Sequence, residues 1–362
     1  MTNKVSSAKA KSILKSLYFP IVAIVMALIG GGLIISSLGF NPLAAYKYLL
    51  KGSFGDINAI SETLIKACPV IFTGLSYAIA SRCGLINLGA EGQLYMGALT
   101  ATIVGTTFEG MPMIIHLPLT LIAGFLGGAI WGLIVGALKV KFGASELITT
   151  IMFNYIAINF ISFCVTGPLK DTAGTFPQSK SIVASSQLPR LLTGTRLHAG
   201  VIVAIIGIVF YYFFMWKTTK GYEMRVIGLN PTAGEYAGMN IKTNSVMAMF
   251  IAGGFAGLGG CIEIIGMQMR LMQNFSTGYG FDGIAVALLG ANSPIGIALS
   301  GVLFGALRSG SGKMEMLAKV PSAVIYMIQA LIILFVVGRA LFDFSKKFKA
   351  TKSSKTKKEM AV

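Results

Sequence analysis

Charged residues are scarce in this sequence. Only 12% of its 362 residues are charged and 54% are hydrophobic, whereas soluble domains contain about 25% charged residues. Apolar runs of about 20 residues, the length that crosses a bilayer, recur along the whole chain. An ordinary soluble fold is therefore excluded, and the sequence predicts an all-α, polytopic integral membrane protein.

Cysteine and histidine are also rare, and they are scattered. No C-x-x-C pair occurs, and the spacings typical of zinc sites or disulfide frameworks are missing. Cysteines in or beside apolar runs usually serve as small hydrophobic side chains. We therefore expect neither a metal centre nor a disulfide framework from Cys68, Cys83, Cys164, Cys261, His116 and His198.

Motifs of enzymes and nucleotide-binding proteins are missing. The segment GSGKM (310–314) ends its glycine-rich part with a lysine, but Met314 stands where a Walker loop needs Ser or Thr. The glycine-rich run 253–261 lies inside an apolar run and follows no predicted strand. No Ser-His-Asp, H-E-x-x-H or paired-carboxylate arrangement stands out. The chain is predicted not to be an enzyme and to bind no cofactor of its own.

Positive charge is concentrated at the two ends. The net charge is +17, with four lysines before the first apolar run and eight lysines or arginines after the last. In a soluble protein this charge would indicate a nucleic-acid partner, but basic residues that flank spans mark the cytoplasmic side of a membrane. We therefore predict cytoplasmic basic ends, 1–16 and 339–362, and no nucleic-acid partner.

The apolar runs predict one transmembrane domain, 17–338, with about ten spans. Alternation from a cytoplasmic start places 217–243 in the cytoplasm and the Pro-, Ser- and Thr-rich segment 167–197 outside. Three basic residues would then face outward, against the positive-inside bias: Arg308, Lys313 and Lys319. The expected spans are 17–38, 60–80, 90–107, 113–138, 145–166, 198–216, 244–266, 283–292, 295–309 and 320–338.

The pair of runs in 283–309 is irregular. At 27 residues it is too short for two full spans, since each needs about 20. Its middle, GANSPIG (290–296), holds Pro294 between glycines. The sequence predicts a broken or re-entrant helical hairpin, which is tolerated only where it is buried in protein or lines a cavity. The alternative is one long tilted span, which would put the termini on opposite sides.

Glycines recur at every fourth position within several runs. Small residues at this spacing let helix backbones approach closely in lipid. We expect helix–helix contacts, within or between subunits, at Gly124, Gly128, Gly132 and Gly136, and at the pairs Gly253/Gly257 and Gly301/Gly305.

Polar side chains in and beside the spans mark a candidate translocation route. In 83–98 they stand among glycines, which permit a turn. There they can contact a polar solute, or they can bond freed backbone groups and neighbouring helices; Glu91 could equally pair with Arg82. The acids fall towards span ends, which disfavours an ion-coupled secondary transporter. The candidate route residues are Asn87, Glu91, Gln93, Asn154, Asn159 and Gln268.

The cytoplasmic segment 217–243 predicts a docking element. Pro231 can open a short helix, Asn230 before it is a suitable cap, and Gly238 could end it. A small apolar face would come from Ala233, Tyr236 and Ala237. A helix held off the membrane in this way suits a groove on a partner protein.

Four segments resemble the permease subunits of bacterial ATP-binding-cassette (ABC) importers. They are GLINLGAEGQ (84–93), ELITTIMFNYIA (146–157), GLNPTAGEYAGMN (228–240) and GFDGIAVALLGANSPIGIALSGVLFG (280–305). The nearest group is the branched-chain amino acid, ribose and nucleoside permeases, and the first segment is closest to the nucleoside permeases.

This resemblance implies a type II-like permease of the bacterial cell membrane that moves nucleosides by alternating access; sugar or branched-chain amino acid permeases are the alternative. It implies a cytoplasmic ATPase that binds ATP and Mg, a second, non-identical permease, and an extracellular or periplasmic substrate-binding protein. Membrane lipid surrounds the two permeases. The family's coupling helix corresponds to 228–240, so the expected coupling residues are Arg225, Gly228, Asn230, Pro231, Glu235 and Gly238.

Overall fold

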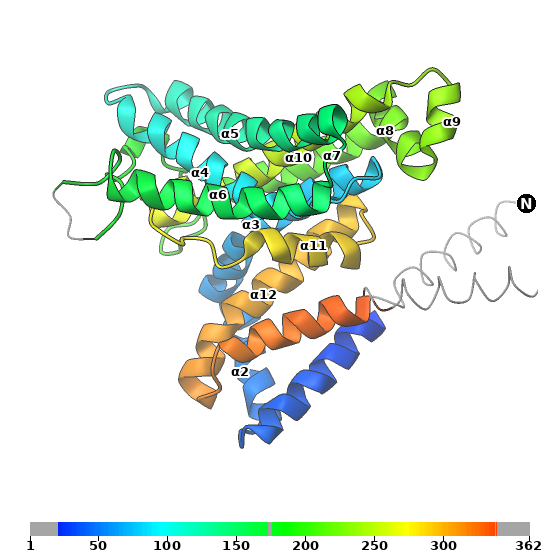
Figure 1. The fold of residues 1–362 in the computed structure, drawn as a ribbon. Coiled ribbons are helices and arrows are strands. Elements are labelled where there is room, and N and C mark those ends of the chain that lie inside the picture. The colour runs from blue at the N-terminus through cyan, green and yellow to red at the C-terminus, as the bar shows by residue number, and fades with distance from the viewer. Residues whose placement is uncertain (1–20, 173–175, 337, 339–362) are drawn as a thin grey trace, which may run out of the picture. The chain divides into compact units, whose positions relative to one another are not determined.

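The computed structural model describes residues 21–172, 176–336 and 338, and within them the chain is helical and contains no β-strand (Figure 1). The chain divides into two compact units, Tyr48–Lys313 and a smaller unit that joins Met1–Lys47 to Met314–Val362. The predicted basic ends and the first residues of the first expected span lie outside the described residues. The all-α prediction is confirmed.

The larger unit contains most of the helices. It begins within α2 (Pro42–Phe54) and ends within α12 (Pro294–Ala318). Between them lie α3 (Ile57–Arg82), α4 (Ala90–Thr107), α5 (Met113–Phe142), α6 (Glu146–Thr166), η1 (Ala184–Ser186), α7 (Gly200–Lys217), α8 (Thr219–Leu229), α9 (Pro231–Tyr236), α10 (Ile241–Glu263), the π-helical turn η2 (Ile264–Gln268) and α11 (Tyr279–Leu289).

In the part of the chain that the structure describes, six helices are long and apolar enough to cross a membrane: α3, α5, α6, α7, α10 continued by η2, and α12. Three shorter apolar helices are Ile21–Ser37, Tyr279–Leu289 and Ala323–Val336. The protein is therefore a polytopic membrane protein, and the number of about ten spans stays a prediction.

Glycine contacts hold the centre of the larger unit together. A β-carbon at Gly128 would collide with the backbone oxygen of Gly253, and one at Gly97 would collide with Gly257. Gly124, Gly128, Gly132 and Gly136 of α5 all face α10, and Gly301 and Gly305 of α12 face α3. The prediction of close helix contacts is confirmed, and these contacts lie within one chain.

In the smaller unit, the helix Ile21–Ser37 packs on Ala323–Val336. A β-carbon at Gly31 would collide with the Ile328 side chain, so a glycine is needed at the crossing. The Tyr46 hydroxyl donates to the Leu28 carbonyl and ties the start of α2 to the same helix.

The predicted break in 283–309 is present between α11 and α12. Gly290 caps α11, Ala291 and Asn292 both have φ of 51°, and α12 starts at Pro294. One continuous tilted helix is therefore not formed. The lengths expected for the two halves were wrong, because α12 continues to Ala318. The polar run after Leu307 lowers the hydropathy there, but it remains helical.

Two segments that the sequence assigns to opposite sides of the membrane lie at opposite ends of the larger unit. Figure 1 shows α8 and α9 at one end and the 167–197 segment at the other. Which of the two ends faces the cytoplasm stays a prediction.

Candidate translocation site and coupling segment

The chain breaks between α3 and α4, where the predicted route residues begin. Gly84 has φ of +78°, in the left-handed region that favours glycine. The buried Asn87 amide fills the break: its nitrogen donates to Gln93 Oε1 at 2.9 Å and to Ser76 Oγ at 3.1 Å. Its oxygen accepts from the Gly89 N–H at 3.0 Å. Asn87 therefore links α3, the break and α4.

Asn154 joins this break from α6. Its oxygen accepts from the Gly92 N–H at 2.8 Å, and its nitrogen donates to the Leu88 carbonyl at 2.8 Å. Backbone groups freed by a helix break must find such partners, because lipid offers none. We name Asn87, Gln93 and Asn154 the amide cluster. The structure brings these three predicted residues together and gives them a bonding role; a solute-contacting role for them stays a prediction.

The other three route residues lie elsewhere. Glu91 Oε2 accepts from the Gly280 N–H at 2.6 Å, so the alternative pairing of Glu91 with Arg82 is wrong. Gln268 donates to Glu263 Oε1 at 3.1 Å and to the Phe275 carbonyl at 3.2 Å. Asn159 is exposed and bonds only its own helix, at Tyr155 O. It stands apart from the amide cluster.

A buried ion pair connects α11 and α12. Arg308 Nε donates to Asp282 Oδ2 at 2.8 Å, and the two side chains are 8% and 11% exposed. The guanidinium also donates to the hydroxyl and the carbonyl of Thr277, and it lies 4.5 Å from the centre of the Tyr279 ring. Arg308, which the predicted topology places towards the outer side of the membrane, is buried and paired with a carboxylate.

A polar pocket of about 380 Å³ lies between the start of α3 and the later turns of α12. Ligand pockets for small molecules commonly measure about 300–1,000 Å³, so a monosaccharide or a nucleoside can fit. Sequence inspection missed it because its residues lie far apart in the chain. It is lined by Gly52, Asp56, Asn58, Ala59, Glu62, Lys66, Ser309 and Lys313.

The charged side chains that line this pocket differ in how closely they are paired. At its mouth Lys313 Nζ binds Asp56 Oδ2 at 2.9 Å, and this hydrogen bond holds the pKa of Asp56 below its usual range. Glu62 Oε1 lies 3.8 Å from Arg196 Nη1, which places the pocket beside the 167–197 segment. Deeper inside, Lys66 Nζ donates to the Arg308 carbonyl at 3.3 Å. The pocket therefore leads towards the buried ion pair.

The predicted docking helix is present as α9. Asn230 caps it, accepting from the Ala233 N–H at 3.1 Å; Pro231 is its first residue, and Gly238 follows with φ of +77°. The helix is open to its surroundings: Tyr236 is 90% exposed, and Ala233 and Glu235 are exposed beside it. The expected local structure of 228–240 is confirmed.

The segment before α9 packs against the break between α3 and α4. A β-carbon at Gly228 would collide with the Arg82 carbonyl and lie close to Gly84. The guanidiniums of Arg82 and Arg225 lie 5.3 Å and 5.8 Å from the Trp216 ring centre. The α8–α9 segment is thus in direct contact with the end of α3.

A second set of bonds fixes α8 and the α11–α12 turn. Glu223 accepts from Asn244 of α10 at 2.8 Å and from Lys220, and both bonds hold the pKa of Glu223 below its usual range. Arg82 donates to the Asn292 carbonyl at 3.0 Å, and the Tyr211 hydroxyl donates to the same oxygen at 2.9 Å. Arg82 therefore touches both helix breaks and the coupling side.

Comparison with known proteins places these features in a family context. The profile of the family described as branched-chain amino acid transport system / permease component matches residues 59–337. The guanosine ABC transporter permease protein NupP of Bacillus subtilis is 42% identical over 91% of this chain and 96% of its own length. No solved structure matches the chain.

Two further relatives cover the chain almost as fully. The nucleoside ABC transporter permease protein NupB of Lactococcus lactis is 36% identical over 94% of this chain and 97% of its own length. The glucose ABC transporter permease protein TsgB13 of Haloferax volcanii is 35% identical over 89% and 87%. In the Bacillus and the Lactococcus a second guanosine or nucleoside permease protein also matches, at 28% and 22% identity.

Proposed function

We propose that this chain is the membrane-spanning permease subunit of an ATP-driven nucleoside importer. The premise is that the chain belongs to the family of branched-chain amino acid transport system permease components. Membership of a permease family confirms the expectation that the chain is not an enzyme. The observation that carries the nucleoside assignment is the 42% identity to a guanosine permease over 91% of the chain.

A sugar permease is the second candidate, and one observation favours it. A glucose permease protein is 35% identical, almost the same as the 36% of the nucleoside permease NupB. The polar pocket does not separate the two, because carboxylates and lysines bond the hydroxyls of a ribose as well as those of a glucose. Nucleosides are favoured by the higher identity of the guanosine relative and by the segment 84–93, which is closest to the nucleoside permeases.

The proposed mechanism is alternating access driven from the α8–α9 segment. A cytoplasmic ATPase, which binds ATP and Mg in place of this chain, docks on the exposed apolar face around Tyr236. Its movement reaches the end of α3 through the packing of Gly228 on Arg82, and from Arg82 it reaches the turn at Asn292. Both helix breaks then shift together, which opens the route on one side and closes it on the other.

The remaining partners follow from the same reasoning. An extracellular or periplasmic binding protein delivers the solute at the end that carries 167–197, where the polar pocket lies. A second, non-identical permease completes the complex; the presence of two matching permease proteins in each of two bacteria supports this. The bacterial cell membrane, with both termini in the cytoplasm, is the proposed location.

Uptake by whole cells tests the proposal. Labelled guanosine should accumulate when the full importer is present, unlabelled nucleosides should compete, and deletion of the ATPase should abolish uptake. Competition by glucose and not by nucleosides would replace the nucleoside assignment by the sugar one. Uptake that survives loss of the ATPase and follows an ion gradient would defeat the importer assignment itself.

One variant pair tests the α8–α9 step. Gly238→Pro cannot keep φ of +77°, since proline fixes φ near about −65°, so it should abolish ATPase association and uptake while insertion into the membrane persists. Gly194→Pro imposes the same conflict, at φ of +81°, in the 167–197 segment and should leave ATPase association intact. Equal ATPase association in both variants would show that α9 is not the docking element.

A further inference from the structure

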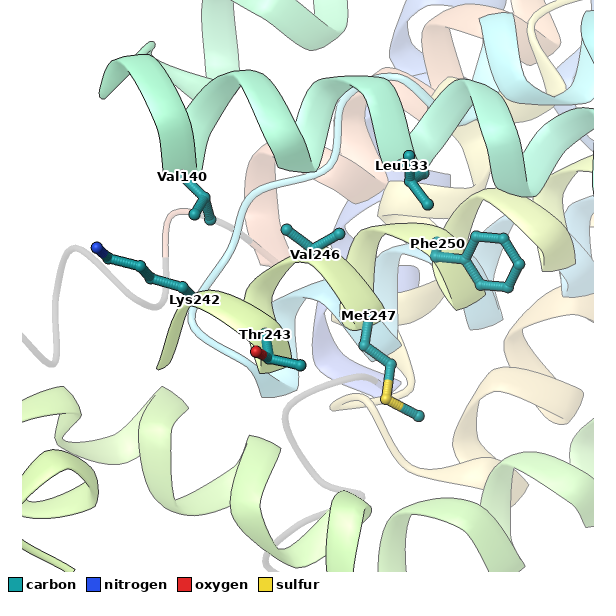
Figure 2. A pocket seen from close by; sticks show the side chains of 7 residues that line it. All are labelled: Leu133, Val140, Lys242, Thr243, Val246, Met247 and Phe250. Atoms are coloured by element: carbon teal, nitrogen blue, oxygen red, sulfur yellow. The ribbon is translucent and has the colours of Figure 1, made fainter. Parts of the chain in front are cut away.

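An apolar groove of about 540 Å³ runs between α5 and α10, away from the polar pocket and the amide cluster. Its lining is apolar except at one end: Figure 2 shows Lys242 and Thr243 together there, with Phe250 and Leu133 towards the other end. The lining residues are Leu133, Val140, Lys242, Thr243, Val246, Met247 and Phe250.

The groove matches a lipid in polarity and length: its apolar part can hold an acyl chain, and its polar end lies where the headgroup would be. From Lys242 to Phe250 the chain advances eight residues of a helix, about 12 Å at about 1.5 Å per residue. A hydrocarbon chain of roughly ten carbons covers this length. Both walls belong to helices that are long and apolar enough to cross a membrane, and Leu133 is 37% exposed. The groove therefore opens towards the lipid.

Lys242 gives the groove a preference for a negatively charged ligand. It is exposed, it lies at the start of α10, and among the described residues it forms no ion pair. It follows α9 by a few residues, so it lies at the coupling end of the protein, where the membrane surface meets the cytoplasm in the predicted topology. Anionic lipids are concentrated at that surface and attract lysines beside a span.

We propose that this groove is a binding site for an anionic phospholipid, with one acyl chain along Val246 and Phe250 and the phosphate on Lys242. A helix of a second subunit is the competing occupant. It would cover the lysine and remove it from water, and a buried cation without a partner is costly. A phosphate supplies the opposite charge and leaves the headgroup in water. The site needs no assumption about the transported solute.

The test uses the purified full-length chain in mixed detergent micelles with dioleoyl phosphatidylglycerol or dioleoyl phosphatidylcholine, and native mass spectrometry counts the lipids retained. The wild type should retain phosphatidylglycerol about tenfold better than phosphatidylcholine. Lys242→Gln should remove this preference and leave phosphatidylcholine retention unchanged. Val246→Trp, which fills the groove, should lower retention of both lipids.

Two controls keep the result interpretable. Lys217→Gln removes a lysine at the end of α7, outside the groove, and should keep the preference. Val246→Leu changes the groove little and reports on folding if the tryptophan variant does not fold. Equal loss of preference in Lys217→Gln and Lys242→Gln would overturn the site, because only overall charge would then matter. Unchanged retention of both lipids in Val246→Trp would also overturn the site, since the retained lipid would then lie outside the groove.

Discussion

The two helix breaks of the larger unit are stabilised in different ways. The break between α3 and α4 is filled by neutral amides, and Asn87 and Asn154 bond backbone groups that the break exposes. The hairpin of α11 and α12 is tied by a charged pair away from its turn: Asp282 lies eight residues before Gly290, and Arg308 lies fourteen residues after Pro294. The neutral break is held by amide hydrogen bonds, whereas the hairpin combines hydrogen bonds at Asn292 in its turn with one charged contact away from the turn.

This difference predicts how each region fails. A buried amide that is removed leaves single donors or acceptors unsatisfied, at about 1–3 kcal/mol for each group. Removal of one partner of a buried ion pair leaves a charge in a poorly polar environment and costs about 3–5 kcal/mol. The hairpin should therefore be more sensitive to one substitution than the amide cluster, although both would still form helices.

The largest effect is expected from Arg308→Met. The variant removes the cation from beside the Asp282 carboxylate, and we expect a loss of about 3–5 kcal/mol in the free energy of unfolding, measured by SDS-induced unfolding in mixed micelles. The double variant Arg308→Met with Asp282→Leu should recover most of this loss, because replacement of both partners by apolar groups is often neutral. A double variant no more stable than the single one would show that the pair is not the main contact of the hairpin.

The next largest effect on stability is expected at one of two asparagines of α6, with the other as its control. Asn154→Leu leaves the Gly92 N–H and the Leu88 carbonyl without their partner, so it should lose about 2–4 kcal/mol by the cost of each unsatisfied group. Asn159→Leu is the matched control, since Asn159 is exposed and bonds only its own helix; it should change stability by less than about 0.5 kcal/mol.

The same pair also tests the route assignment. Unchanged uptake in Asn159→Leu would remove Asn159 from the candidate route. Lost uptake in Asn159→Leu at normal stability would instead place the solute against the exposed side of α6, and the amide cluster would then be a support beside the route. Normal stability in Asn154→Leu would contradict the bonding role of the cluster.

Local features of the fold could be predicted from the sequence. The cap at Asn230 and the proline after it lie in adjacent positions, so their geometry needs no tertiary contact. The break near Pro294 and the glycine contacts of α5 were predicted for the same reason, since spacing along one helix determines them. These predictions need only the rules of backbone conformation and close helix approach.

Features that depend on partners far apart in the chain could not be predicted. The carboxylate partners of Arg308 and Lys313, Asp282 and Asp56, are recognised only in the folded chain. The polar pocket was missed for the same reason. The length of α12 was also underestimated, since hydropathy alone does not show that a polar stretch is neutralised inside the protein.

The smallest effect on stability is expected at the two carboxylates that line the polar pocket, and these two should differ in their effect on uptake. Asp56 caps α3 and binds Lys313 at 2.9 Å, whereas the ion pair that Glu62 forms among the described residues is the longer one with Arg196, at 3.8 Å. Glu62→Gln should lower uptake about tenfold or more, the range expected when a bond to a charged group is weakened, and should leave stability unchanged. Asp56→Asn keeps a side chain able to cap the helix and should leave uptake unchanged.

The pH dependence of stability identifies the Asp56 contribution. Because the pKa of Asp56 is lower in the folded protein than in the unfolded chain, its ionised form stabilises the fold at pH values above the unfolded pKa, and this stabilisation is lost as the pH falls through the folded pKa. The wild type should therefore lose slightly more thermal stability than Asp56→Asn when the pH falls below about 4, the ordinary pKa of an aspartate. Parallel melting curves for the two proteins over that range would mean that Lys313 does not hold the carboxylate, and the pocket would then present two available acids to the solute.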